Sequence, residues 1–216
     1  MSSSKPRILS HRLTQLIQLI QEGSGEVLWD IGCDHGLLGL SAPGLRPRLK
    51  EVHFVDPSDP VITVLENTID AHIPKPLFKI TLHKQAGEEL TIPATDNVFI
   101  IAGMGGMSIL RILAHLRQQS RESDQFVIAP NRDIWTVRAA LHEAGWGLRG
   151  ERLVEEGGQF FQLLALAPIK TVRAVSLYGE DFWQSVVGER YKSHLLDKMS
   201  VHRDAASLAL LQWLRR

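Results

Sequence analysis

Residues 27–40, VLWDIGCDHGLLGL, place three polar or reactive side chains directly after a run of apolar residues: Cys33, Asp34 and His35. The pattern predicts a strand, a tight turn on Gly32 and a helix, which is where α/β proteins bind nucleotide-like ligands. The glycines are spaced G-x-x-x-G, whereas dinucleotide-binding enzymes use G-x-G-x-x-G. The turn therefore indicates a ligand site without identifying the ligand.

An acidic residue follows the second predicted strand. Asp56 stands 24 residues after Gly32 (56 − 32), at the end of the run VHFV. Nucleotide sites use an acid at about this position to accept both ribose hydroxyls, and Gly32 lets the backbone approach the ligand closely. Asp30 could orient the turn or meet an ammonium group. The run Asp-Pro-Ser-Asp-Pro is also a strong loop signal, so a purely local role for Asp56 stays open.

Composition argues against several classes of protein. The 24 basic and 24 acidic residues balance, so no overall charge attracts nucleic acid or a membrane. Cys33 is the single cysteine, which excludes an intramolecular disulfide and favours a small turn residue, and no Cys/His cluster has zinc-like spacing. No apolar run is long enough to span a membrane, and the first residues lack the apolar core of a signal peptide. We expect a soluble cytoplasmic protein without a metal or a membrane partner.

Strands and helices alternate along most of the chain. The predicted strands are 26–31, 52–55, 77–82, 97–102 and 126–129. The predicted helices are 9–20, ended by Gly23 and Gly25; one that opens at Leu37 and is broken at Pro43; one capped by Asp59 with Pro60 as its first residue; 109–116; and one capped by Asp133 that stops at Gly145. Two further strands, 146–154 and 159–167, are separated only by 155–158, so they must form an antiparallel hairpin.

This outline matches the α/β, Rossmann-like seven-stranded sheet of methyltransferases, which ends in an antiparallel strand. We expect residues 1–172 to form this domain with its N-terminal helix, and 173–216 to form a short helical C-terminal extension. Its two predicted helices, from Tyr178 onward and over 201–216, could pair in a homodimer. The fold implies S-adenosyl-L-methionine as cofactor, and methyltransferases often place a group such as Glu88 against its adenine.

Six segments, in order, carry a closer resemblance. They are Leu9-Ser10-His11-Arg12-Leu13, Asp30-Ile31-Gly32-Cys33-Asp34-His35, Ile101-Ala102-Gly103-Met104-Gly105-Gly106, Ala129-Pro130-Asn131, Gly145-Trp146, and Glu156-Gly-Gly-x-Phe. In these segments the chain resembles the bacterial tRNA adenine-N(1)-methyltransferases of the TrmK type, which modify adenine 22 of tRNA. The resemblance covers residues 8–168, and the ordered set is far more specific than any single motif.

The resemblance implies roles for cofactor-binding residues. Arg12 matches the arginine of the opening motif and becomes a candidate for the methionine carboxylate. Gly32, Asp34 and Gly103 match the turns that line the cofactor. Glu88 falls where the family has Gly-Asp-Gly-Leu, here Gly-Glu-Glu-Leu.

The resemblance also implies a substrate side, on which Gly105 lies near the target base. The three residues expected to contact or orient this base are His35, Met104 and Asn131. Phosphate contacts are expected from Arg132 beside the site and from a basic loop on the same face. That loop carries Arg46, Arg48 and Lys50. The family holds tRNA with a helical arm longer than the segment found here.

N-1 of adenine carries an in-plane lone pair, so it can attack a sulfonium methyl group without prior deprotonation. Catalysis would then be mainly positioning with exclusion of water, and a paired base would first be extruded. Two alternatives stay open: a methyltransferase that acts on another RNA, a protein or a small molecule, and a non-catalytic Rossmann-like binding module.

Overall fold

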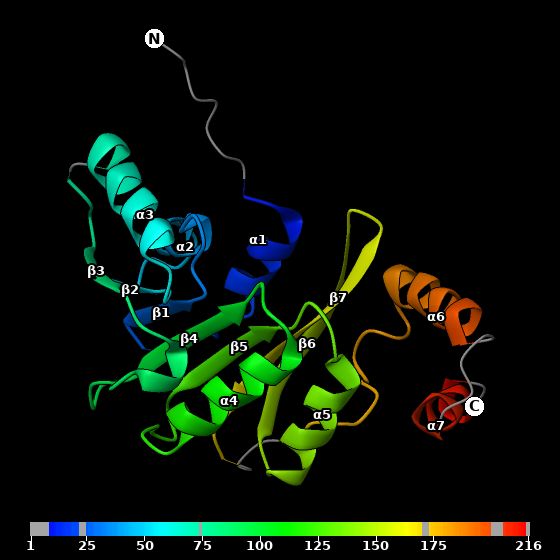
Figure 1. Ribbon diagram of the computed structural model, residues 1–216. Coiled ribbons are helices and arrows are strands. Elements are labelled where there is room, and N and C mark those ends of the chain that lie inside the picture. The colour runs from blue at the N-terminus through cyan, green and yellow to red at the C-terminus, as the bar shows by residue number, and fades with distance from the viewer. Residues whose placement is uncertain (1–8, 22–24, 74, 170–172, 200–204, 215–216) are drawn as a thin grey trace.

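A seven-stranded sheet forms the centre of the protein (Figure 1). The computed structural model describes residues 9–21, 25–73, 75–169, 173–199 and 205–214. The strands are β1 (Val27–Ile31), β2 (Glu51–Val55), β3 (Lys79–His83), β4 (Asn97–Ala102), β5 (Gln125–Ala129), β6 (Gly147–Glu156) and β7 (Gln159–Ala167). Their order is β3-β2-β1-β4-β5-β7-β6, with β1 to β5 parallel and β7 antiparallel to both of its neighbours. This confirms the predicted sheet and its reversed strand.

Helices cover both faces of the sheet. The helices in the described residues are α1 (His11–Gln18), α2 (Leu37–Leu45), α3 (Asp59–His72), α4 (Gly106–Arg117), α5 (Ile134–Glu143), α6 (Val186–Met199) and α7 (Ala205–Leu214), with a short 3-10 helix η1 (Gly87–Glu89). Apolar residues of α1, α2 and α3 pack on one face, and those of α4 and α5 on the other. None of the described helices is long and apolar enough to cross a membrane.

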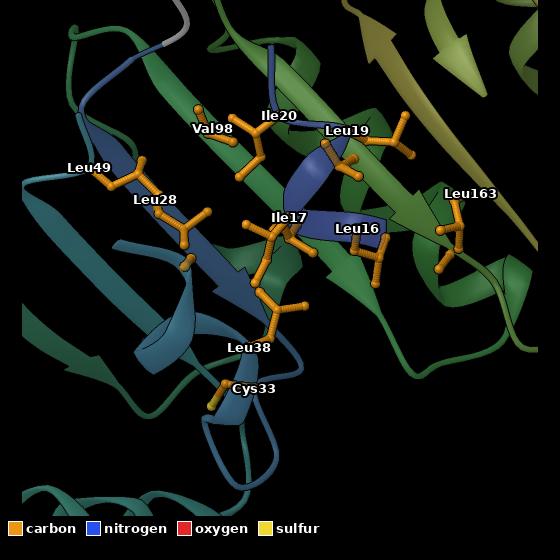
Figure 2. Packing of buried hydrophobic residues seen from close by; sticks show 14 of the residues in the cluster. Leu16, Ile17, Leu19, Ile20, Leu28, Cys33, Leu38, Leu49, Val98 and Leu163 are labelled. Atoms are coloured by element: carbon orange, nitrogen blue, oxygen red, sulfur yellow. The ribbon is translucent and has the colours of Figure 1, made fainter. Parts of the chain in front are cut away.

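Helix α1 is fixed by a local cap and by burial. Ser10 precedes it, and its hydroxyl accepts a hydrogen bond from the backbone N–H of Leu13 at 3.3 Å. Leu16 and Ile17 are fully buried against residues of the sheet, as Figure 2 shows. The N-terminal segment is thereby held against the same domain that carries the turn after β1.

Three predicted element boundaries are wrong. Helix α2 continues through Pro43 to Leu45, because a proline removes only its own N–H and the Arg46 N–H still bonds to the Ala42 carbonyl. Helix α3 begins at Asp59 itself, with Ser58 at the cap position. The helix expected from Tyr178 begins only at Val186.

The late start of α6 has a backbone cause. Gly179 has a φ of +81°, in the left-handed region that a right-handed helix cannot contain. The indole N–H of Trp183 donates to the Tyr178 and Gly179 carbonyls, at 3.0 and 3.1 Å, which holds this stretch in turns. Gly23, expected to end the first helix, and residues 201–204 and 215–216 of the last predicted helix lie outside the described residues.

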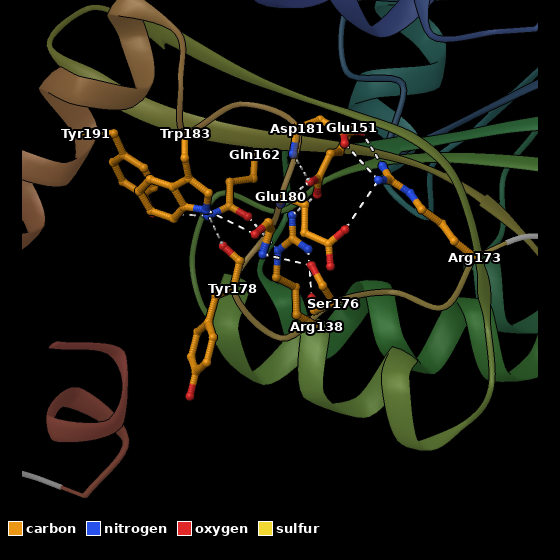
Figure 3. Close-up of polar contacts among 11 residues, drawn as sticks. Arg138, Glu151, Gln162, Arg173, Ser176, Tyr178, Glu180, Asp181, Trp183 and Tyr191 are labelled. Carbon is orange, nitrogen blue, oxygen red and sulfur yellow. Dashed lines mark hydrogen bonds and ion pairs between the residues drawn. The ribbon is translucent and has the colours of Figure 1, made fainter. Parts of the chain in front are cut away.

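A buried polar network ties the C-terminal segment to the sheet (Figure 3). The guanidinium of Arg138, on α5, forms an ion pair with Glu151 on β6, and both side chains are completely buried. Arg138 also donates to the Ser176 carbonyl at 2.9 Å. The Glu151 carboxylate accepts the backbone N–H groups of Glu180 and Asp181 at 2.6 and 3.0 Å. One buried pair therefore fixes the path of the chain after β7.

Candidate active site

The turn after β1 is built on Gly32. Its φ of +76° favours glycine, and its N–H donates to the Val55 carbonyl at 2.8 Å, which joins the ends of β1 and β2. The buried Asp30 side chain accepts the Gly39 N–H at 2.9 Å, from the first turns of α2. Of the two roles that the sequence left open for Asp30, this geometry matches orientation of the turn.

Acidic side chains surround the turn. Burial raises the pKa of Asp30 to about 7, opposed by the Gly39 hydrogen bond and assisted by the charge of Asp34. Burial also raises the pKa of the Cys33 thiol, and the nearby carboxylates of Asp30 and Asp56 raise it further. The thiol therefore stays protonated, which argues against a nucleophilic role. A turn lined by carboxylates suits a cationic ligand.

Asp56 lies at the end of β2, as predicted, and is partly buried. Its Oδ1 accepts the backbone N–H of Ser58 at 2.9 Å, a local turn that fixes the side chain. A carboxylate has about four acceptor sites, so this single bond leaves capacity for two hydroxyl donors. The local role and the ligand role are compatible in one geometry.

Contacts join the turns after β1, β4 and β5. A Cβ added to Gly32 would lie 2.6 Å from the terminal methyl carbon of Met104, so the Met104 side chain lies over this turn. The Met104 carbonyl accepts the Asn131 N–H at 2.9 Å. The Asn131 side chain accepts a hydrogen bond from Arg12 Nη1 at 3.2 Å. Four predicted site residues from distant parts of the sequence therefore form one continuous group.

Glu156 and Phe161 complete this group and were not among the predicted site residues. Glu156 accepts the backbone N–H of Arg12 at 3.0 Å, and its Oε2 lies 3.6 Å from Arg12 Nε. The Arg12 guanidinium stands 4.3 Å from the centroid of the Phe161 ring. Burial favours a higher pKa for Glu156, but hydrogen bonds from the Arg12 backbone N–H and the Ser10 side chain, together with the charge of Arg12, outweigh burial and lower the pKa. The Glu156-Gly-Gly-x-Phe segment was the available signal for Glu156; its phenylalanine is Phe160, and Phe161 follows it.

The substrate-side residues from the β4 and β5 turns also meet. A Cβ on Gly105 would lie 2.8 Å from Arg132 Nε, so no larger residue fits there without moving the arginine. The Arg132 side chain is 80% exposed and lies 3.7 Å from Asp133. Asp133 has the predicted position before α5, with φ +64°, but its side chain makes no capping hydrogen bond. Gly103 has a φ of +78° and open space where a Cβ would stand.

Three other predicted residues lie on the same edge of the sheet with different partners. Asp34 and His35 are both exposed and pair with each other, His35 Nδ1 to Asp34 Oδ1, at 2.7 Å. Glu88, in η1, pairs with Arg111 Nε at 3.2 Å. Its neighbour Gly87 is buried against Ile31 at the end of β1.

The expected position of Arg46, Arg48 and Lys50 is wrong. They lie between the end of α2 and the start of β2, and this type of connection returns the chain to the amino ends of parallel strands. The Arg46 guanidinium donates to the Ile17 and Gln18 carbonyls at 3.2 and 2.7 Å, where α1 ends. These cations are therefore on the edge opposite the candidate site.

Among the described residues, no group of three or more His, Cys, Asp or Glu side chains is placed to hold a metal ion.

The sequence matches the family described as "Methyltransferase domain" over residues 9–164. The chain belongs to this methyltransferase family. The matched span includes the β1 turn, the β4 and β5 turns and the β6–β7 hairpin, which are the segments that meet at the site. A Mycoplasma pneumoniae protein, provisionally named a tRNA methyltransferase, is 27% identical over 166 residues, which are 75% of this chain and 73% of that protein.

Solved structures share the fold of this methyltransferase. Streptococcus pneumoniae Sp1610, solved with S-adenosyl-L-methionine, has a TM-score of 0.76 at 20% identity, over 96% of this chain and 98% of that one. The Bacillus subtilis m1A22 tRNA methyltransferase TrmK has a TM-score of 0.69 at 19% identity, over 96% of this chain and 94% of that one. Because so little of either chain is unmatched, the expectation of a markedly shortened C-terminal segment is wrong for these two structures.

Proposed function

We propose that this methyltransferase transfers a methyl group from S-adenosyl-L-methionine to N-1 of an adenine in tRNA. The observation that carries the proposal is the continuous group of Gly32, Met104, Asn131 and Arg12 at the carboxyl ends of the strands. Open α/β sheets bind ligands at this edge. The tRNA methyltransferases among the similar proteins support the choice of substrate, and tRNA as substrate would place the reaction in the cytoplasm.

The residues at the β1 and β2 ends fit the cofactor. Asp56 would accept the ribose hydroxyls, Gly32 would allow close approach, and Arg12 would bind the carboxylate of the methionine part. The acidic surroundings of the turn would favour the cationic ammonium and sulfonium groups. When bound, S-adenosyl-L-methionine supplies a methyl group on a positively charged sulfur. Glu88 would approach the adenine end, next to η1.

The β4 and β5 turns would hold the target base. The side-chain amide oxygen of Asn131, Oδ1, accepts one hydrogen bond from Arg12 and can accept a second from the exocyclic amine of an adenine. Met104 lies between Asn131 and Gly32 and would orient the base and exclude water. N-1 then attacks with its own lone pair, so these residues need only position it. Arg132 would contact a phosphate, and His35 stands exposed at the rim.

Methylation of unmodified tRNA transcripts, read by nucleoside mass spectrometry, tests the reaction. The expected product is 1-methyladenosine, and cofactor affinity is measured on the same protein by calorimetry. Asp56→Ala should weaken cofactor binding by about 10- to 150-fold, as loss of charge-assisted hydrogen bonds worth about 1.5–3 kcal/mol predicts. An unchanged cofactor affinity would contradict the ribose assignment.

Arg132→Ala should raise the KM for tRNA and leave cofactor affinity unchanged, because the side chain is exposed on the substrate side. Arg48→Ala is the matched control, because it removes an exposed arginine from the opposite edge. Equal effects of the two substitutions would show that only overall charge matters. Cofactor binding without any methylated nucleoside would reject tRNA as the substrate.

A further inference from the structure

A cavity of about 830 Å³ lies beside the candidate site. It is bounded by the start of α5, the turn of the β6–β7 hairpin, the segment before α6, and α6 itself. Its volume falls within the roughly 300–1,000 Å³ of pockets that hold drug-sized ligands. Asn131 belongs both to the lining of this cavity and to the group formed with Arg12 and Met104. The cavity is therefore continuous with the position proposed for the target base.

Aromatic rings line the cavity. Trp135 comes from α5, Phe160 from β7, Tyr178 from the segment before α6, and Tyr191 from α6. The Trp135 ring is partly exposed and lies 6.4 Å from both the Tyr178 and the Tyr191 rings, nearly parallel to the latter at 17°. Flat rings that are partly exposed in a cavity can stack another flat ring at low entropic cost.

The lining also carries basic side chains. His194 and Lys198 stand on successive turns of α6, and Lys198 is exposed. His194 contacts the Phe160 ring, with centroids 5.3 Å apart. An ammonium group at the edge of an aromatic cavity suits a ligand with a flat ring and a phosphate. An apolar peptide would use the rings but not this charge.

The walls are held in place by the buried network. The Tyr191 hydroxyl accepts a hydrogen bond from Gln162 Nε2 at 3.3 Å, and Gln162 in turn accepts one from Arg138 at 2.6 Å (Figure 3). Arg138 is the residue that ties the segment before α6 to the sheet. The cavity is thus a preformed feature of the fold.

We infer that this cavity binds the nucleobase next to the methylated adenine in the RNA substrate, stacked on Trp135, with Lys198 near the adjoining phosphate. The inference rests on the proposed function. Extrusion of a base from a stem separates it from its neighbours and costs a few kcal/mol. Stacking of a neighbour on an aromatic side chain returns about 1–3 kcal/mol. The cavity would therefore favour the extruded form of the RNA.

Abasic substrates test this directly in the full-length protein. Two tRNA transcripts are made in which the nucleotide on one or the other side of the methylated adenine lacks its base. For the wild type, one of the two should raise the KM by about 5- to 150-fold, which corresponds to the 1–3 kcal/mol of a stacked base. In Trp135→Leu the intact tRNA should already show the raised KM, and removal of the base should add little. Trp135→Phe keeps a ring and should restore most of the difference.

A second variant guards against misfolding. Lys198 is exposed, so Lys198→Gln should fold normally and raise the KM for intact and abasic RNA alike. It should also reduce the slope of log affinity against log salt concentration by about one. Cofactor affinity should match the wild type in every variant. If Trp135→Leu folds, binds cofactor and responds to the abasic substitution as the wild type does, the stacking role is wrong. If the wild type methylates no RNA, the proposed function itself fails.

Discussion

Asp30 gives this fold a measurable dependence on pH. Its side chain is completely buried behind the β1 turn, and burial raises its pKa from the ordinary 3.8 to about 7. Between these two values the folded protein binds a proton that the unfolded chain has released. The contribution of Asp30 to stability must therefore fall as the pH rises from about 4 to about 7, and then level off.

The size of the effect follows from the shift. Each unit of pKa corresponds to about 1.4 kcal/mol, so a shift of about three units amounts to about 4 kcal/mol over the whole range. The Asp30→Asn variant stays neutral at every pH and can still accept the Gly39 N–H. Relative to the wild type, it should therefore gain about 2.5 kcal/mol between pH 5 and pH 7.5.

Urea unfolding of both proteins at several pH values measures this gain. All other titrating groups are common to the two, so the difference between the free energies of unfolding isolates Asp30. A difference that stays constant with pH would refute the reasoning. Cofactor affinity at pH 8 gives a second readout: orientation of the turn predicts little change in Asp30→Asn, whereas a direct contact with the ligand's ammonium group predicts a clear loss.

Three further predictions concern the other polar networks. Arg138→Met should cost about 3–5 kcal/mol in urea unfolding, because it leaves Glu151 charged and buried, and the double variant with Glu151→Leu should recover part of the loss; additive effects would contradict the pairing. Glu156→Gln should weaken cofactor binding several-fold, because it removes the carboxylate charge that orients the Arg12 guanidinium, with no change for Glu155→Gln as control. Because the pKa of Glu156 is lowered in the folded protein, its ionised carboxylate stabilises the fold at pH values above the ordinary carboxyl pKa. Urea unfolding should show this contribution disappear as the pH falls into the acid range, and it should be absent from Glu156→Gln.

The sequence could predict features that depend on residues close together in the chain. Gly32, Asp56 and the β4 turn could be placed on one edge because parallel strands end at the same side of a sheet. The same rule would have placed Arg46 and Arg48 on the opposite edge, because they follow a helix and precede a strand. The prediction that these arginines lie beside the site failed because it used only their charge and ignored the direction in which the chain runs.

Long-range contacts could not be predicted in this way. The bond between Arg12 and Glu156 joins residues 144 positions apart, and no periodicity relates them. The cavity depends on rings from α5, β7 and α6, whose mutual position is set by the buried Arg138–Glu151 pair. Nor did the helical pattern after Tyr178 reveal that Gly179 adopts a left-handed conformation.

The position of β7 between β5 and β6 has a consequence for how the chain folds during synthesis. Strand β5 ends at Ala129, but the strand that covers its free side is completed only at Ala167, after β6 has been made. Until then β5 presents unpaired N–H and carbonyl groups along an apolar strand, which is a template for pairing with other chains. A released chain truncated before residue 159 should therefore aggregate, whereas one extended through residue 167 can pair β7 with β5 and cover this edge.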